Sequence, residues 1–226
     1  LISYQVAHQK TFDVARKLLG RGHEVVLLLF PFKFRPPPIG PKRYQDRPWQ
    51  LLGEPHPGGC PFESVAIGGW ADEFVPRFAS AGCDLYLHCT AKIVPASFIE
   101  GRTILNCHPG LLPQNRGVDA FKRSIVNQWP VGVTLHIIDE QIDRGSILKR
   151  VPVPVLESDE LEDVCQRMYA YEIDLLGNFE HHLDSERVPV GDEYPCSHAK
   201  IAMDDDMRLE KLFDEYKKSD ACCVIR

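Results

Sequence analysis

Short apolar runs alternate with helix-forming segments along the first half of the chain, and this alternation strongly limits the folds that the chain can adopt. The runs expected as strands are residues 1–6, 24–30, 64–67, 84–87 and 103–106, and the expected helices are 11–19, 72–81 and 95–100. Strands that alternate with helices are typical of parallel sheets built from βαβ units. We therefore predict an α/β fold with a doubly wound, mostly parallel sheet, helices on both faces, and ligands bound at the carboxyl ends of the strands.

The second half of the chain continues with strand-like and helical segments. We expect a helix over 119–127, strands over 131–138 and 146–155, a long helix from a Ser158 cap to about Leu183, and a helix over 207–216. The long helix carries a continuous apolar stripe that suits core packing. A chain of 226 residues is long enough for one well-buried domain. We predict a main, catalytic domain over 1–183 and a polar, acidic C-terminal extension with a short helix over 184–226.

Charge and cysteine content argue against several classes of partner. The formal net charge is −6, so the surface as a whole lacks the basic footprint of proteins that bind nucleic-acid backbones. No apolar run approaches the length of a membrane span, and no signal peptide opens the chain. The eight cysteines show no CxxC spacing, which disfavours zinc and disulfide frameworks. We expect a cytoplasmic protein without nucleic-acid or membrane partners, while its oligomeric state is unknown from the sequence.

The stretch 105–148 holds the candidate catalytic residues. Asn106 and His108 alternate after an apolar run, so both project to one side of the expected strand. Thr134 and Asp143 follow in and after a second apolar run. An amide can hold a developing oxyanion, an imidazole can move a proton near neutral pH, and a carboxylate can orient the imidazole. Because the stretch has no nucleophile elbow, and Cys107 alternates away from its polar neighbours, these groups suit direct attack of an amine on an acyl carbon.

These residues also carry a resemblance to a known family. The segments NCHPGLLPQNRG and GVTLHIIDEQIDRGSIL resemble the two signature segments of the folate-dependent formyltransferase superfamily. The resemblance implies a formyltransferase-like variant of the Rossmann fold, with Asn106, His108 and Asp143 as the catalytic trio. Asn106 and His108 would bind the formyl oxygen, and Asp143 would pair with His108 and help to move a proton. Thr134 stands where family members often place a hydroxyl that orders a water.

The same resemblance implies 10-formyltetrahydrofolate as the co-substrate in one-carbon transfer, with no metal. The pterin would lie between the loop that follows the second run and an A-x-x-I-x-P-like segment. The residues expected to contact it are Ala91, Lys92, Ile93, Val94, Ile138, Asp139, Glu140 and Ile142. The three acids of the 139–143 loop do not supply the ligand number or spacing of a calcium loop.

The identity of the amine acceptor rests on weaker sequence signals. The turn 3–10 lacks the glycines with which glycinamide ribonucleotide formyltransferases hold a phosphate, so His8 and Lys10 are the candidates for substrate contact there. A solvated turn is equally compatible with the residues. Arg116 is a third candidate, which could instead orient its loop or form a structural salt bridge. His136 is interpreted as a packed imidazole.

The Pro-rich segment 31–61 is expected as a long loop, and its basic and aromatic residues suit a nucleotide-linked ligand or a merely solvated loop. We predict a small-molecule primary amine as acceptor, first a nucleotide-linked amino sugar and second glycinamide ribonucleotide. The alternatives are a formyltetrahydrofolate hydrolase and a folate- or nucleotide-binding module without turnover.

Overall fold

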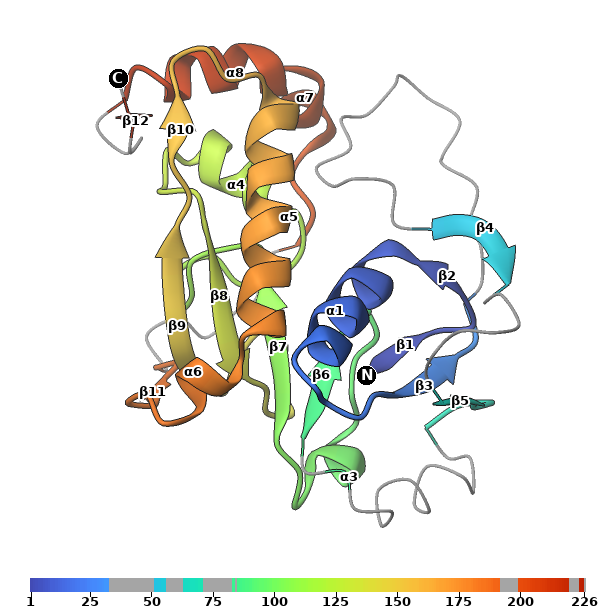
Figure 1. The fold of residues 1–226 in the computed structure, drawn as a ribbon. Helices are drawn as coiled ribbons and strands as arrows, with labels where there is room; N and C mark the ends of the chain where they lie inside the picture. Colours follow the sequence, from blue (N-terminus) through green and yellow to red (C-terminus); the bar gives the residue numbers. More distant parts are fainter. Residues whose placement is uncertain are drawn as a thin grey trace.

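The structure is a computed structural model that describes residues 1–32, 51–55, 63–70, 83, 85–191, 199–219 and 224–225. Its centre is an eight-stranded sheet with the strand order β11-β9-β8-β7-β6-β1-β3-β5. Figure 1 shows this sheet running through the molecule with helices packed against it. The predicted α/β fold with a doubly wound, mostly parallel sheet is confirmed.

The parallel part of the sheet comes from the first half of the chain. Its strands are β1 (Ile2–Tyr4), β3 (Val26–Phe30), β5 (Glu63–Ala66), β6 (Tyr86–His88) and β7 (Ile104–His108). From β1 the chain adds β3 and β5 on one side, and it then returns to add β6 and β7 on the other side. This reversal between β1 and β6 is the position at which doubly wound sheets bind ligands, outside the carboxyl ends of the strands.

Antiparallel strands complete the sheet beyond β7. They are β8 (Gly132–Ile137), β9 (Ser146–Pro152) and β11 (Val188–Pro189). The pairing of β7 with β8 places Asn106 opposite His136 and His108 opposite Thr134. Side chains that the sequence separates by about thirty residues therefore meet across one pair of strands.

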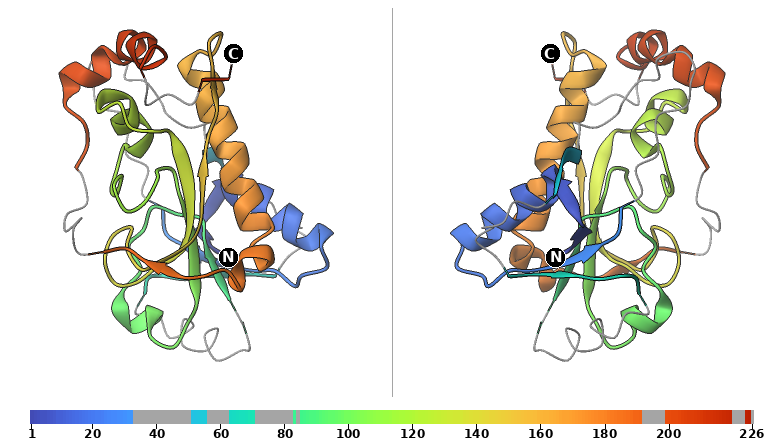
Figure 2. Two further views of the ribbon diagram at one scale, coloured as in Figure 1. Left: turned by 90° about the vertical axis from the view of Figure 1, so that its left-hand side faces the viewer. Right: turned by 90° about the vertical axis from the view of Figure 1, so that its right-hand side faces the viewer.

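Helices cover both faces of the sheet. On one face, α1 (Gln9–Gly20) packs beside α5 (Leu161–Gly177), and their apolar sides join the main core cluster (Figure 2). On the other face, Phe98 of α3 (Ala96–Ile99) packs in a smaller cluster with Ile2, Phe30 and other strand residues. The helix predicted over 72–81 lies outside the described residues.

The long C-terminal helix begins and ends differently from the prediction. A capping box formed by Glu160 and Asp163 starts α5, so Ser158 is not the cap. The helix stops at Asn178, and a separate short helix, α6 (Glu180–Leu183), follows. The apolar stripe packs in the core as expected, because the buried residues of α5 recur on one side of the helix.

The C-terminal segment packs against the main core. Two helices, α7 (Met203–Met207) and α8 (Leu209–Tyr216), lie beside α4 (Ala120–Val126). Leu209, Phe213 and Tyr216 belong to the same core cluster as α1 and α5. The helix expected over 207–216 is therefore confirmed with slightly different bounds, whereas the domain boundary at residue 183 stays a prediction.

Two small strand pairs lie outside the main sheet. The strand β2 (Val6–His8) pairs antiparallel with β4 (Leu51–Pro55), and β10 (Val155–Leu156) pairs parallel with β12 (Val224–Ile225). The expectation of an irregular loop over 31–61 was thus wrong for 51–55, because main-chain pairing with β2 overrides the local proline signal. Most of that segment lies outside the described residues. Among those residues, no helix is both long and apolar enough to cross a bilayer.

Candidate active site

A pocket of about 590 Å³ opens at the carboxyl ends of β1, β6 and β7, at the reversal point of the sheet. Phe32 and residues from five longer segments line it, within 4–10, 88–94, 106–109, 117–120 and 138–143. Asn106, His108 and Asp143 all line this pocket. The structure therefore brings the predicted trio to one cavity, while the catalytic role of each residue stays a prediction.

His108 and Asp143 form the central ion pair of the pocket. The His108 Nδ1 atom lies 3.3 Å from Asp143 Oδ1, and the Gly117 backbone N–H donates to Asp143 Oδ2 at 2.8 Å. Burial alone raises the pKa of the Asp143 carboxyl, but the charge and hydrogen bond of His108 and the Gly117 amide outweigh it and lower the pKa to about 2. Asp143 is therefore ionised at neutral pH.

The second nitrogen of His108 is also engaged. Its Nε2 atom lies 2.7 Å from the backbone oxygen of Asn115. A carbonyl and a carboxylate only accept hydrogen bonds, so both ring nitrogens can be satisfied only when each carries a proton. The geometry thus fits an imidazolium, whose positive charge lies beside the pocket and beside the Asp143 carboxylate.

The Asn106 amide is oriented by a neutral histidine. His136 is fully buried and its pKa is lowered to about 4, by burial and then by the charge of His108. Its Nδ1 donates to the Arg144 backbone oxygen at 3.0 Å, which leaves Nε2 to accept from Asn106 Nδ2 at 3.1 Å. One Asn106 N–H is fixed in this way, and the second can donate to a carbonyl oxygen in the pocket. The interpretation of His136 as a packed imidazole is confirmed.

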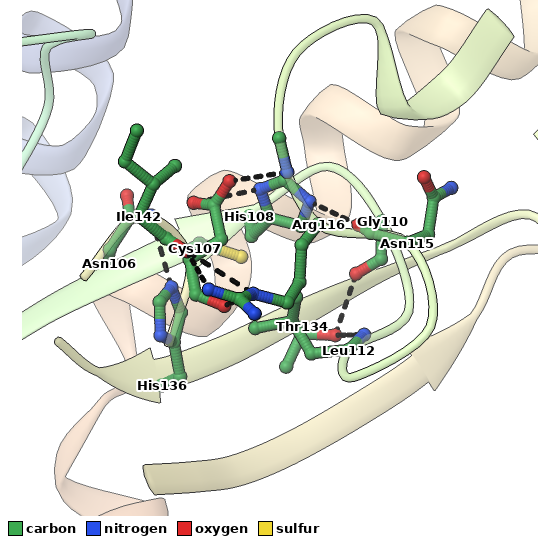
Figure 3. Close-up of polar contacts among 12 residues, drawn as sticks. Asn106, Cys107, His108, Gly110, Leu112, Asn115, Arg116, Thr134, His136 and Ile142 are labelled. Atoms are coloured by element: carbon green, nitrogen blue, oxygen red, sulfur yellow. Dashed lines mark hydrogen bonds and ion pairs between the residues drawn. The ribbon is translucent and has the colours of Figure 1, made fainter. Parts of the chain in front are cut away.

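Thr134 lies opposite His108 in the β7–β8 pair but does not line the pocket, and its predicted catalytic role stays a prediction. Its hydroxyl is fully buried, donates to the Gly110 oxygen at 2.7 Å and accepts from the Leu112 N–H at 3.1 Å (Figure 3). These bonds hold the turn that follows β7. Gly110 is required in this turn, because a Cβ there would lie 2.9 Å from His108 Nε2.

The predicted substrate contacts have mixed outcomes. His8 and Lys10 line the pocket, but the Lys10 ammonium points to Glu172 at 2.7 Å in a buried ion pair. Its charge is therefore directed into the protein interior. Arg116 is 3% exposed and does not line the pocket. Its guanidinium contacts the loop that carries Asp143, which agrees with the loop-orienting alternative, while its contact with the acceptor stays a prediction.

The segments expected to bind the pterin form part of the pocket wall. All eight residues predicted for this contact, in 91–94 and 138–142, line the cavity. The Tyr4 hydroxyl accepts the Ala91 N–H at 2.8 Å and anchors the first segment to β1. Ile93 and Ile142 are 67% and 47% exposed, which is unusual for large apolar side chains and suits contact with a flat heterocycle. Their role in folate binding stays a prediction.

Several pocket residues were not predicted for the site from the sequence, among them His88 and Asp119. His88 lines the pocket, and its pKa is lowered to about 4, by burial and by the nearby charges of Lys10 and His136. The sequence signal that could have identified His88 is its position directly after the apolar run of a predicted strand. Asp119 also lines the pocket and has a positive φ of 55°, which no sequence pattern indicated. Within the part of the chain that the structure describes, no group of three His, Cys, Asp or Glu residues is arranged to hold a metal.

The two buried neutral histidines make the stability of the protein depend on pH. Each has a folded pKa of about 4, below the ordinary 6.5, so the unfolded chain takes up protons first as the pH falls. We expect the free energy of unfolding to be constant above pH 6.5 and to fall by a few kcal/mol between pH 6.5 and 4. Urea unfolding at a series of pH values measures this. His136→Gln should make the slope shallower, and an equal slope in both proteins would contradict the assignment.

Comparisons with known proteins agree with this geometry. Residues 72–178 match the family model described as formyl transferase. A dTDP-4-amino-4,6-dideoxyglucose formyltransferase of Mycobacterium bovis is 31% identical over 136 residues, which cover 60% of this chain and 54% of the relative. A phosphoribosylglycinamide formyltransferase of Haemophilus influenzae is 34% identical over 76 residues, 32% of this chain and 36% of the relative.

A solved structure of a candidate sugar N-formyltransferase from Mycobacterium tuberculosis has a similar fold. It superposes with a TM-score of 0.54 at 26% identity, over 88% of this chain and 72% of that one. The chain spans about half the length of the Mycobacterium bovis relative.

Proposed function

We propose that this chain, a relative of the formyl transferases through its segment 72–178, transfers a formyl group from 10-formyltetrahydrofolate to a primary amine of a small metabolite. The observation that carries the proposal is the His108–Asp143 ion pair at 3.3 Å, in one pocket with the Asn106 amide. The pocket is also lined by the two segments expected to hold the pterin. A charged imidazole, an oriented amide and a carboxylate at one cavity suit formyl transfer through a tetrahedral intermediate.

Each residue of the trio has a distinct task in this proposal. The amine nitrogen of the acceptor attacks the formyl carbon, the bond from that carbon to the folate nitrogen breaks, and the folate nitrogen gains the proton that the amine loses. Asn106 donates an N–H to the formyl oxygen as negative charge develops there. The His108 imidazolium stabilises the same charge through space. Asp143 receives the hydrogen bond of the attacking amine and guides its proton toward the folate nitrogen.

A nucleotide-linked amino sugar is the acceptor that we favour. The relative from Mycobacterium bovis acts, by its name, on such a sugar and matches this chain over 136 residues. The first turn argues against glycinamide ribonucleotide, because it lacks the glycines that would hold a phosphate and the Lys10 charge is paired with Glu172. Glycinamide ribonucleotide is the second candidate, supported by the shorter match to the relative from Haemophilus influenzae.

The decisive experiment measures tetrahydrofolate release from 10-formyltetrahydrofolate with and without an acceptor. We expect release only when an amine is added, and faster release with a dTDP-4-amino sugar than with glycinamide ribonucleotide. Equal release without an acceptor would identify a hydrolase instead. Binding of folate without any release would identify a binding module, and either result would overturn the proposal.

A further inference from the structure

The loop that carries Asp143 has an unusual backbone. Asp143 has a φ of 47°, in the left-handed region that side chains other than glycine seldom adopt. Two residues later, Gly145 has a φ of 100°, and a Cβ at that position would lie 2.1 Å from the Ile137 oxygen. A strained backbone of this kind persists only where the surrounding structure holds it, and such positions cluster at active sites.

Arg116 supplies contacts that hold this loop. Its Nη2 donates to the Ile142 oxygen at 2.7 Å, and its Nε lies 3.2 Å from the same oxygen and 3.1 Å from the Asp143 oxygen. Figure 3 shows the Arg116 side chain extended beside His108 toward Ile142. The guanidinium therefore binds the carbonyl oxygens of the two peptides that flank Asp143.

The residue that follows Arg116 binds the side chain of Asp143. The Gly117 N–H donates to Asp143 Oδ2 at 2.8 Å, and the other carboxylate oxygen faces His108. Arg116 and Gly117 are adjacent in sequence, so a shift of one moves the other. The Arg116 guanidinium fixes the backbone of Asp143, and the Gly117 backbone amide fixes the Asp143 carboxylate.

We propose that Arg116 is a positioning residue, which holds Asp143 in its left-handed conformation and so sets the distance between its carboxylate and the His108 ring. This inference rests on the proposed function, because it assigns Arg116 a part in arranging the same site. Lysine cannot replace it, because one ammonium group does not reproduce the planar fork that reaches two carbonyl oxygens.

The test compares Arg116→Lys with Arg144→Lys, a matched change on the same loop. The Arg144 guanidinium is partly exposed and contacts Gln141 and Asp139, so its replacement leaves the Arg116 contacts in place. In the formyl-transfer assay we expect Arg116→Lys to lower kcat by roughly 100-fold, as small misplacements of catalytic groups do, with little change in the KM of the acceptor. Arg144→Lys should stay close to wild type. Equal kcat values for wild type and Arg116→Lys would overturn the inference.

A second measurement does not depend on turnover. The ring ¹⁵N signals of His108 report the contact of its Nδ1 atom with Asp143, and they can be assigned by comparison with a His108 variant. We expect the Nδ1 signal to shift in Arg116→Lys but not in Arg144→Lys at one fixed pH, because the Asp143 carboxylate is no longer held 3.3 Å from that nitrogen. If wild type transfers no formyl group, the proposed function fails, and this comparison still tests the positioning by Arg116. Unchanged ¹⁵N signals in a folded Arg116→Lys protein would overturn the inference.

A third variant separates positioning from folding. Arg116→Ala leaves a space for the missing guanidinium, and we expect ethylguanidinium, but not ethylammonium, to restore part of kcat. Unfolding of both Arg116 variants while Arg144→Lys stays folded would also count against the inference, because Arg116 would then be a structural residue only.

Discussion

His108→Ala should lower kcat for formyl transfer by about 10²–10³-fold, the range expected when a group that stabilises a developing oxyanion is lost. The substitution removes the positive charge beside the pocket and leaves the Asp143 carboxylate without its 3.3 Å partner. Steady-state rates at saturating folate and acceptor measure the effect. A binding module without turnover would show no such change, and an unaltered rate would remove His108 from the mechanism.

The same variant has a signature in the pH profile. His108 and Gly117 hold the pKa of Asp143 at about 2 against the opposing effect of burial. Without His108, burial remains, so the pKa of Asp143 should rise. If the reaction needs the ionised Asp143 carboxylate, kcat should begin to fall at a higher pH in the variant than in wild type. The acid limb of the kcat–pH profile therefore shifts to higher pH. His181→Ala is the control, because His181 is exposed on α6 and does not line the pocket.

Glu172→Gln should lower the free energy of unfolding by about 3–5 kcal/mol, because it leaves the Lys10 ammonium buried without its carboxylate. The two groups lie 2.7 Å apart, with side chains 6% and 2% exposed. For a chain of this size, the melting temperature should fall by roughly 10 °C. Denaturant unfolding and thermal melting both measure the loss.

An exposed pair on the same two helices provides the control for this substitution. Lys17 and Asp174 also join α1 to α5, at 2.8 Å, but their side chains are 40% and 59% exposed. Asp174→Asn should cost less than about 1 kcal/mol. If both variants lost the same stability, burial would not be the reason for the importance of the Lys10–Glu172 pair. The double change Lys10→Met with Glu172→Leu should recover much of the loss.

Local signals were sufficient for the trio to be selected from the sequence. Alternation in the strand that ends at His108 puts Asn106 and His108 on one side, and the later acid precedes a glycine in a tight loop. The same reasoning did not show that the Thr134 hydroxyl is buried. Alternation gives the face of a strand but not its depth, and the antiparallel register with β7 buries this hydroxyl under the turn at Gly110.

Long-range partners decided the roles of the charged residues. Lys10 was a reasonable substrate ligand by its position in the first turn, but Glu172 lies 162 residues away in sequence and takes its charge. Arg116 and Asp143 are 27 residues apart, and their contact depends on how two loops fold over the same strand ends. Ion pairs and hydrogen bonds of this kind have no local pattern, since any basic side chain can find its partner anywhere in the chain.

The sequence by itself determined the order of strands and helices, the doubly wound sheet and the identity of the amide, imidazole and carboxylate, because periodicity and motif spacing are local properties of the chain. Only the tertiary structure decided which of these groups carry charge at the pocket and which are held in the interior. Burial, strand register and distant partners set the protonation of His88, His136 and Asp143, and these are properties of the folded chain as a whole.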